Sequence, residues 1–381
     1  GVEKLAERYA IVTVRDGVIE GLPGRASPLL RLLIGKAAEA AKKVTGRIET
    51  KAAIDGPTVL ASASTQDVEA PQMRDAVFDA SDVVIDGEEH AGAFERMVTG
   101  ATERLIIHST FLSEPRALAV LPLLIKAAER GARVDILWGQ DDVGTGTRSS
   151  QVVAAKLQAL VTDAGWDASI RIHPFSTNSH AKIVVADTAK GGWNALIGSC
   201  NWLASDFASF EASMRLRDPF LVGSLLRKLG GLAQGRPGVW NDLAVELSVL
   251  GRRVMERLPV GGRKVPMRLI YGSEHARLVL EARDTARERL FVLSHRIGLA
   301  AHPVALLPAL AAVEANGIAA TFYYGRTTGP LSGAAGADLI REYANKGLNI
   351  KPIQRPRLHA KVLGWDRNAL AISSLNWLSA D

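Results

Sequence analysis

The chain has 381 residues, of which 47% are hydrophobic and 23% charged. This balance excludes a disordered chain and is typical of a folded protein with two or three domains. The formal net charge of +6 favours a polyanionic partner without identifying one. The single cysteine, Cys200, excludes an intrachain disulfide and favours a reducing compartment, so we expect a cytoplasmic protein. We find no signal peptide and no run that could cross a membrane, and we expect no membrane insertion.

Residues 1–88 form a region of their own, because the repeat that organises the rest of the chain begins at residue 89. We expect a small α+β region, in which the sequence predicts a hairpin at Tyr9–Glu20 that turns on Asp16 and Gly17. A helix from Pro28 to about Val44 is expected to follow. We assign this region no function.

A repeat relates residues 89–265 to residues 266–381. Glu103–Ile107 matches Glu288–Val292 at an offset of 185, and a second match ends at Gly139 and Gly325, at an offset of 186. Each copy predicts a helix, a strand, a crossover helix, a strand and then two further strands. We therefore expect an α/β fold of two lobes, with residues 89–265 forming lobe 1 and residues 266–381 forming lobe 2.

The predicted strands are short and apolar, which is typical of strands covered on both faces: Leu105–Ser109, Val134–Trp138, Leu290–Ser294 and Ala320–Tyr324. The apolar segments Arg116–Ala127 and Gly298–Val313 predict the crossover helices. Between the lobes, residues 219–268 predict an insertion or linker, with helices near Leu221–Leu232 and Asn241–Arg257.

Each copy contains the motif His-x-Lys-x4-Asp followed by Ser-x-Asn-Trp-Leu. The two sets of motif residues are His180, Lys182, Asp187, Ser199 and Asn201, and His359, Lys361, Asp366, Ser374 and Asn376. Residues two apart on a strand project from one face, so each histidine points with its lysine and each serine with its asparagine. The aspartates follow their histidines by an odd number of residues, so we place them at the strand ends in a supporting role. A single such motif is usually a surface pair or a turn, but two copies in register argue against that.

These residue types suit the cleavage of a phosphodiester. Imidazole is a nucleophile and, near neutral pH, a proton donor, so two histidines can divide these roles as one coupled pair. The lysines supply positive charge, and the serines and asparagines donate hydrogen bonds to the phosphoryl oxygens. We therefore expect no metal and no cofactor. The alternative, a His/Asp metal site, is disfavoured because a lysine beside each histidine would repel the ion.

The duplicated motif resembles the signature of the phospholipase D superfamily, over about residues 89–381. The resemblance implies two lobes about a pseudo-twofold axis with one active site between them. One histidine would attack the phosphorus to form a covalent phosphohistidine, and the other would protonate the leaving oxygen. The resemblance also implies that Glu211 holds the histidine ring from behind, and family precedent favours His180 as the nucleophile. In the second copy, Ser373 departs from the glycine that Gly198 supplies in the first.

Other residues near the motifs are assigned to packing. We interpret Cys200 as core filler, and His90 and His275 as capping or packing residues at helix starts. Trp202 and Trp377 are expected to close the core behind the motif, with the border of the substrate cleft as the alternative.

The superfamily includes lipid and nucleic-acid phosphodiesterases, so the fold alone does not choose a substrate. Basic residues precede the second motif and occupy the linker, among them Lys351, Arg355, Arg357, Arg263 and Lys264. If they flank the cleft, they would contact a nucleic-acid backbone, and otherwise they form a solvated face. The lack of membrane helices argues against a lipid synthase, and the aspartates argue against the DNA-repair branch that releases adducts.

We therefore expect a metal-independent nuclease that acts on DNA. The chain begins at Gly1 and stops five residues after Asn376, which favours a module of a larger bacterial DNA-processing or defence protein, with flanking domains or partner proteins. One alternative is a phospholipase D or transphosphatidylase acting on lipid headgroups. Another is a nucleic-acid-binding scaffold with weak or no catalysis.

Overall fold

The computed structural model describes residues 13–15, 18–20, 72–140, 149–234, 241–259, 261–272 and 274–379. The chain divides into two compact units, residues 1–70 and residues 71–381. In the first unit, β1 (Thr13–Arg15) pairs antiparallel with β2 (Val18–Glu20), within the predicted hairpin. The predicted turn at Asp16 and Gly17 and the predicted helix that starts at Pro28 lie outside the described residues.

The second unit begins earlier than the predicted boundary between residues 88 and 89. It includes β3 (Arg74–Val77), the 3-10 turn η1 (Ala80–Asp82) and β4 (Val83–Ile85). β4 pairs with a motif-region strand of lobe 1, so residues 71–88 are part of that lobe. β11 (Lys264–Met267) pairs with β3, so the predicted boundary between residues 265 and 266 falls inside a strand.

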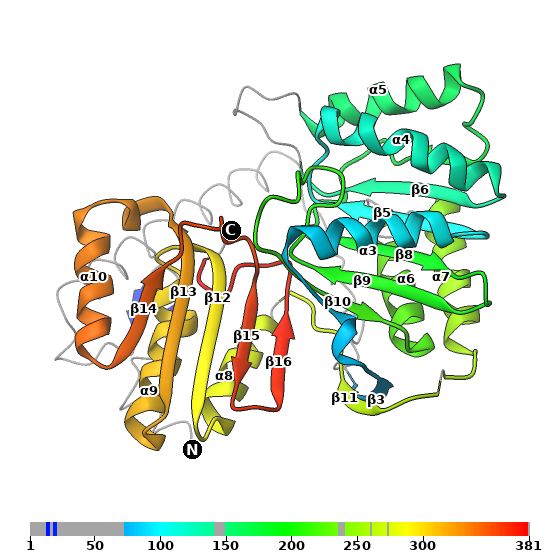
Figure 1. Ribbon diagram of the computed structural model, residues 1–381. Helices are drawn as coiled ribbons and strands as arrows, with labels where there is room; N and C mark the ends of the chain where they lie inside the picture. The colour runs from blue at the N-terminus through cyan, green and yellow to red at the C-terminus, as the bar shows by residue number, and fades with distance from the viewer. Residues whose placement is uncertain are drawn as a thin grey trace. The chain divides into compact units, whose positions relative to one another are not determined.

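Lobe 1 has the predicted order of elements, with one more helix and strand before the motif strands. Its first helices are α3 (Asp86–Gly100), α4 (Glu114–Glu129) and α5 (Ser150–Asp163). Its other strands are β5 (Arg104–Ser109), β6 (Arg133–Trp138), β7 (Ile170–Ile172), β8 (Ile183–Asp187), β9 (Trp193–Gly198) and β10 (Ala212–Leu216). Within the described residues they form one mixed sheet in the order β4-β10-β9-β8-β5-β6-β7 (Figure 1).

Helices cover both faces of this sheet. Helices α3, α4 and α5 pack on one face, where Phe94, Leu124 and Trp202 are buried in one cluster. Helices α6 (Pro219–Ala233) and α7 (Asp242–Met255) pack on the other face against Ile106 and its neighbours. The segment predicted as an insertion or linker is therefore a layer of the lobe 1 core. As predicted for a strand covered on both faces, β5 is buried along its whole length.

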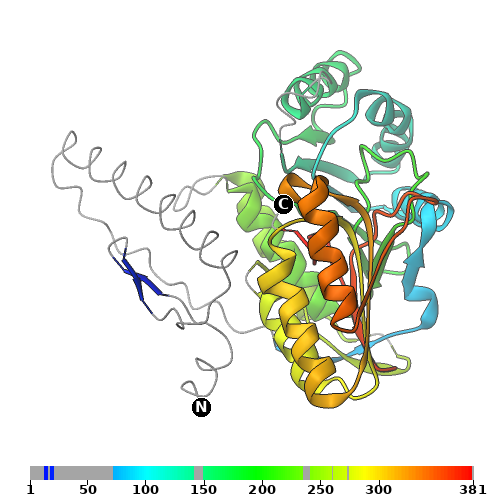
Figure 2. The ribbon, with the colours of Figure 1, turned by 90° about the vertical axis from the view of Figure 1, so that its left-hand side faces the viewer.

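Lobe 2 repeats this plan with a smaller sheet. Its strands are β12 (Arg289–Ile297), β13 (Ala319–Thr327), β14 (Leu348–Pro352), β15 (Val362–Trp365) and β16 (Ala369–Ile372). They lie in the order β14-β13-β12-β15-β16. Its helical segments are α8 (Glu274–Thr285), the π-helical turn η2 (His302–Leu306), α9 (Leu307–Asn316), the 3-10 turn η3 (Gly329–Ser332) and α10 (Ala334–Asn345). Figure 2 shows α9 and α10 side by side over the sheet.

The second face of the lobe 2 sheet differs from the prediction. Positions along β12 and β13 alternate between buried and partly exposed, so these strands are not covered fully on both faces. The partly exposed face carries Phe291, Leu293 and Tyr323, which pack in a small cluster with Leu358 and with Ala212 of lobe 1. This face is less buried because it meets the end of β10 instead of a layer of helices. The two lobes pack together through this cluster.

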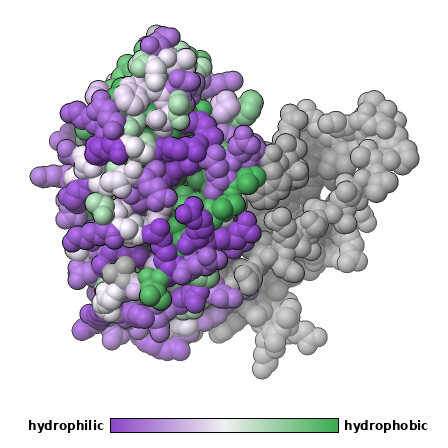
Figure 3. Space-filling view, turned by 90° about the vertical axis from the view of Figure 1, so that its right-hand side faces the viewer, coloured by the Kyte–Doolittle hydropathy of each residue, from purple (hydrophilic) through white to green (hydrophobic). Residues whose placement is uncertain are grey.

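The face of lobe 1 that Figure 3 shows is largely hydrophilic, with apolar side chains gathered in small patches. Exposed large apolar side chains such as Val152, Phe175 and Leu258 come from separate segments of the lobe. In the part of the chain that the structure describes, no helix combines the length and the apolar character that a membrane span requires.

Candidate active site

The two His-x-Lys segments lie where the lobes meet. Each is extended and immediately precedes a strand, β8 in lobe 1 and β15 in lobe 2, rather than lying within it as predicted. Each histidine still points with its lysine. Lys182 Nζ lies 3.2 Å from His180 Nδ1 and donates to Thr110 Oγ1 at 2.6 Å. Lys361 Nζ donates to the main-chain oxygen of His359 at 2.6 Å.

Matched glycines allow both segments to lie against the parallel strands. A Cβ atom at Gly139, directly after β6, would overlap the Ser179 carbonyl oxygen. A Cβ atom at Gly325, in β13, would lie 2.8 Å from the Leu358 carbonyl oxygen. Real Cβ atoms are not found this close to a carbonyl, so each histidine segment needs a residue without a side chain beneath it.

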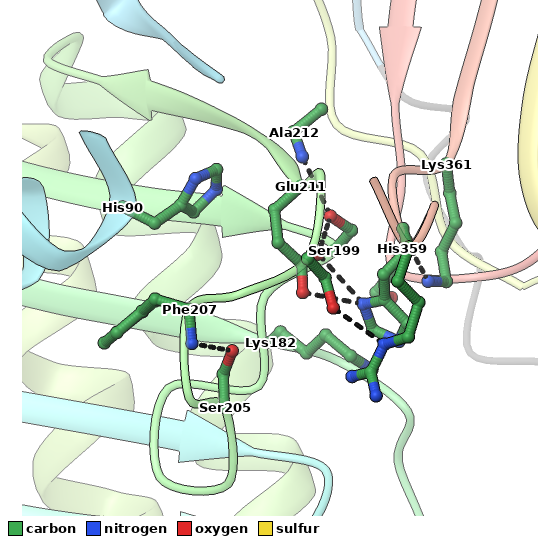
Figure 4. A network of polar contacts seen from close by, with 12 residues as sticks. His90, Lys182, Ser199, Ser205, Phe207, Glu211, Ala212, His359 and Lys361 are labelled. Carbon is green, nitrogen blue, oxygen red and sulfur yellow. Dashed lines mark hydrogen bonds and ion pairs between the residues drawn. The ribbon is translucent and has the colours of Figure 1, made fainter. Parts of the chain in front are cut away.

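Each histidine is held by the opposite lobe. His359 Nδ1 lies 2.8 Å from Glu211 Oε1, and Glu211 belongs to lobe 1 (Figure 4). His180 Nδ1 lies 2.8 Å from the main-chain oxygen of Ser374, which belongs to lobe 2. The main chains are also joined, since His359 N donates to the Phe210 carbonyl at 2.9 Å. Because Glu211 follows the first motif, it was expected to hold the ring of His180. In the structure it contacts His359, the histidine of the second motif.

Ser199 holds Glu211 in place. Its hydroxyl donates to Glu211 Oε2 and accepts a hydrogen bond of 2.9 Å from Ala212 N. Ser199 is fully buried, and its hydroxyl is engaged with these two protein groups. The structure therefore gives Ser199 a positioning contact in place of the predicted phosphate contact.

The remaining phosphate-binding candidates differ between the lobes. Ser374 offers its main-chain carbonyl to His180. Asn376 Oδ1 accepts from Arg296 N at 3.3 Å, which ties the asparagine to the end of β12. The Asn201 Oδ1 atom is buried and has no hydrogen-bond partner among the described residues. Both asparagines are partly buried at the lobe junction, and a phosphate contact from them stays a prediction.

Burial sets the electrostatics of the site. It lowers the pKa of Lys182 well below its usual value, with help from nearby Lys361, and it lowers the pKa of Lys361 to about 7. Burial, followed by the nearby lysines, also lowers the pKa of His180 and His359. Burial raises the pKa of the Glu211 carboxyl. The site thus gathers cationic groups that lose their protons readily unless an anion binds among them.

One family matches part of the sequence. Its description is "Cardiolipin synthase, PLD-like domain", and the match covers residues 95–228, including the first motif. Among solved structures, the chain is similar in fold to the phosphatidylserine synthase of Haemophilus influenzae Rd KW20, with a TM-score of 0.52 and 12% identity over 77% of this chain and 78% of that one. Residues 95–228 are thus a phospholipase D-like domain. Members of the phospholipase D superfamily are phosphodiesterase-type enzymes.

Two other solved structures are more distant. The polyphosphate kinase of Porphyromonas gingivalis has 10% identity and a TM-score of 0.46, over 78% of this chain and 45% of that one. The phospholipase D family member Nuc of Salmonella typhimurium has 14% identity and a TM-score of 0.28, over 52% of this chain and 99% of that one. Neither likeness bears on the substrate of this chain. No curated protein matches the sequence.

In both lobes, the motif aspartates lie away from the histidines. Asp187 ends β8, and its carboxylate accepts from the backbone N–H groups of Thr102, Glu103 and Arg104. Asp366 follows β15 and accepts in the same way from the backbone N–H groups of residues 287–289. Seven residues of extended chain separate Asp187 from His180, a distance of roughly 20 Å. The aspartates anchor the turns before β5 and β12, which agrees with a supporting role.

Some predicted contributors to a nucleic-acid surface lie beside the histidines and others do not. Arg357 lines a pocket next to His359, and Arg355 is exposed on the same loop. Lys351 is exposed on β14. Arg263 and Lys264 lie at the start of β11, and Figure 1 shows this strand far from the loops that precede β8 and β15. The structure therefore does not bring the linker residues to the site.

The sequence reasoning missed three side chains at the site. Thr110 receives the hydrogen bond from Lys182, the His295 ring centroid lies 4.7 Å from that of His359, and Arg326 lines the same pocket as His359. Thr110 and His295 directly follow the predicted strands Leu105–Ser109 and Leu290–Ser294, at the offset of 185, and Arg326 directly follows the matched Gly325. Continuing the comparison of the two copies past these points would have found them.

The residues assigned to packing do pack. Trp202 and Trp377 are buried in the cores of their lobes, as is Cys200. His90 Nε2 lies 2.9 Å from Ser213 Oγ, whereas its counterpart His275 lies 2.7 Å from Ser373 Oγ. The hydroxyl that contacts this histidine comes from Ser213 in lobe 1 and from Ser373 in lobe 2. A Cβ atom at Gly198, the lobe 1 counterpart of Ser373, would overlap Ser213, so lobe 1 has a glycine there. Among the described residues, no group of three or more His, Cys, Asp or Glu side chains could hold a metal ion.

Proposed function

We propose that this chain is a metal-independent nuclease that cleaves DNA through a covalent phosphohistidine. The observation that carries the proposal is the pair of histidines presented from two lobes, each fixed at Nδ1 by the opposite lobe and each accompanied by a buried lysine. A fixed Nδ1 leaves Nε2 for chemistry on a phosphodiester. Nucleic acid is favoured as the substrate because arginine side chains line the pocket beside His359.

His359 is proposed as the nucleophile. Its Nδ1–H donates to the Glu211 carboxylate, so the lone pair resides on Nε2. The negative charge of Glu211 also stabilises the positive ring that forms when Nε2 bonds to phosphorus. The sequence favoured His180 as the nucleophile because Glu211 follows the first motif. The glutamate contacts the other histidine, so the same argument now favours His359.

His180 is proposed as the general acid. A carbonyl oxygen only accepts, so the Ser374 carbonyl fixes the Nδ1–H of His180, and a second proton on Nε2 can pass to the leaving oxygen. In the first step, His359 Nε2 bonds to phosphorus, the P–O bond breaks, and its electron pair remains on that oxygen, which takes the proton from His180. In the second step, water gives its proton to His180 and bonds to phosphorus, and the P–N bond electrons return to His359.

Lys182 and Lys361 are proposed to stabilise the phosphoryl oxygens during both steps. Both lysines are buried, and Figure 4 shows both side chains extending toward His359. Preorganised cations in a dry site stabilise the developing charge by several kcal/mol, on the order of 3–4 for each donor. The negative charge of the bound substrate also offsets the burial that lowers the pKa of both lysines.

A lipid phosphodiesterase or transphosphatidylase is the second candidate. It is favoured by the matched family, described as "Cardiolipin synthase, PLD-like domain". The fold likeness to a phosphatidylserine synthase agrees with it but concerns the fold alone. A non-catalytic nucleic-acid scaffold is disfavoured, because both histidine-lysine pairs are complete and oriented.

One assay separates these candidates. The protein is incubated in EDTA with plasmid DNA, RNA and phosphatidylcholine vesicles, beside the His359→Ala variant. Cleavage of DNA that persists in EDTA and is lost in His359→Ala supports the nuclease. Release of phosphatidic acid without DNA cleavage would establish the lipid enzyme instead. Salt-sensitive DNA binding without turnover of any substrate would indicate the scaffold, and DNA cleavage that requires Mg²⁺ would contradict the mechanism.

A further inference from the structure

The two lobes match at the histidines and lysines but differ in the residues beside them. The lobe 1 positions are Thr110, Gln140 and Asn178, and the corresponding lobe 2 positions, 185, 186 and 179 residues later, are His295, Arg326 and Arg357. Three neutral side chains in one lobe are thus replaced by an imidazole and two guanidiniums in the other. The centre of the site is nearly symmetric, whereas its flanks differ in charge.

The lobe 2 side chains line a pocket of about 250 Å³ next to His359. The described residues that line it include His295, Arg326, Arg357 and His359. We call it the lobe 2 anion pocket. No aspartate or glutamate is among these lining residues, so the charge of its arginines is not neutralised within the pocket.

The arginines of this pocket are placed to receive an anion. Arg357 Nε donates to Ser209 Oγ at 2.8 Å, so a contact from lobe 1 orients its guanidinium. Arg326 forms no hydrogen bond or ion pair with any described residue. Arg326 and Arg357 line the same pocket, and burial, together with the positive charges of Arg296 and Arg357, lowers the pKa of Arg326. An anion bound between these arginines would offset their positive charges.

We propose that the lobe 2 anion pocket binds a second phosphate of a nucleic-acid strand, the neighbour of the phosphate that is cleaved. This inference rests on the proposed nuclease function. The planar fork of a guanidinium matches phosphate oxygens, and a nucleic-acid strand carries a phosphate on each side of the cleaved one. A lipid with a single phosphodiester has no second phosphate to fill the pocket.

The asymmetry of the flanks limits this contact to one side of the site. The positions that correspond to Arg326 and Arg357 in lobe 1 hold Gln140 and Asn178, so the neighbouring phosphate on the lobe 1 side meets no matching pair of guanidiniums. One neighbouring phosphate therefore contributes to binding in the pocket, and the neighbour on the other side of the cleaved bond does not.

The test uses two oligothymidylates of equal length whose linkages are otherwise neutral methylphosphonates. One contains a single phosphodiester, and the other contains two adjacent phosphodiesters. For the wild-type protein, the second substrate should have the higher kcat/KM by about tenfold, because only there can a neighbouring phosphate occupy the pocket. Arg326→Gln, which installs the lobe 1 residue, should reduce this ratio to about the twofold expected from counting bonds. The matched control Arg263→Gln removes the same charge directly before β11 and should keep the ratio.

The outcomes separate the inference from the proposed function. A wild-type ratio of only about two, or a ratio that Arg326→Gln preserves, would overturn the pocket assignment while the nuclease stands. A similar loss on both substrates in Arg326→Gln would show a structural role for Arg326 and would also overturn it. If the wild-type protein cleaves neither these substrates nor plasmid DNA, the proposed function itself is wrong.

Discussion

At the scale of single residues, the site depends on a carboxylate that lies 148 positions from the histidine it contacts. Glu211 is buried, receives the Ser199 hydroxyl and lies 2.8 Å from His359 Nδ1. These contacts fix the tautomer of His359 and supply the negative charge that a phosphorylated ring needs. Burying a carboxylate without such partners would cost free energy, so the contacts with Ser199 and His359 explain how Glu211 can be buried here.

Replacing this carboxylate tests its role. Glu211→Gln keeps the size of the side chain but removes its charge, so the positive ring of the intermediate loses its counter-charge. We expect kcat to fall by about a hundredfold or more, with a smaller effect on KM. Ser199→Ala is the matched control, because it removes one contact of Glu211 and leaves its charge, and it should cost much less. Equal activity of Glu211→Gln and the wild-type protein would remove Glu211 from the mechanism.

The pH dependence of the reaction follows from Lys361. Burial lowers its pKa to about 7, so in the free enzyme Lys361 is protonated below that pH and neutral above it. Because the phosphate needs the ammonium form, kcat/KM should fall as the pH rises through about 7. The bound anion favours the charged form, so the corresponding limb of kcat should lie at higher pH.

Steady-state rates between pH 5 and pH 10 measure both limbs, and Lys361→Arg provides the control. An arginine stays protonated over this range, so its profile should lose the part of the alkaline limb that Lys361 causes, while His180 and Lys182 still titrate, even if the rates are lower throughout. A wild-type kcat/KM that stays flat to pH 9 would show that Lys361 is not needed as a cation.

At the scale of elements, the histidine segments are positioned by their contact with the parallel strands. The glycines at the ends of these contacts, Gly139 and Gly325, are matched in the repeat, and the contact is closer at Gly139. This explains why a catalytic segment can lie outside the strands and still be rigid. The main chain is held against the sheet by van der Waals contact on one side and by the opposite lobe on the other.

A methyl group at Gly139 should therefore displace the His180 segment. We expect Gly139→Ala to reduce kcat by at least about tenfold, because it forces a shift next to a reacting group. The variant should also be destabilised, by about 1–3 kcal/mol. Gly100→Ala is the control, since a Cβ atom there has no neighbour within 4 Å. Thermal unfolding and steady-state kinetics measure both effects, and unchanged kcat in Gly139→Ala would contradict this account of the segment.

At the scale of the whole molecule, the sequence predicted those features that follow from the spacing of residues along the chain. The alternating strand and helix patterns of the repeat predicted the α/β fold and the element order of both lobes, and the duplicated motif predicted the two histidine-lysine pairs. The sequence also predicted the helices of residues 219–268, but hydrophobic periodicity does not say which surface a helix covers, and α6 and α7 proved to be part of the lobe 1 core. The lobe boundaries were misplaced because pairing of β4 with β10 and of β11 with β3 leaves no local pattern.

The contacts across the lobes were also beyond the sequence. Spacing relates residues on one strand, whereas Glu211 with His359 and Ser374 with His180 are brought together only by the packing of two lobes. The charge difference between the flanks could have been read from the repeat, because Gln140 and Arg326 occupy corresponding positions. The functional interpretation of that difference required the structure, because only the structure shows that Arg326 and His359 line the same pocket.

The central claim is that His359 of lobe 2, supported by Glu211 of lobe 1, attacks the phosphate. The most direct measurement is to trap the covalent intermediate with a nucleotide 4-nitrophenyl phosphodiester, whose leaving group needs no proton, and to locate the adduct by mass spectrometry of peptides. The His180→Ala variant should accumulate the adduct on His359, because water lacks its base in the second step. His359→Ala should form none. An adduct on His180 in His359→Ala, with none in His180→Ala, would contradict the account.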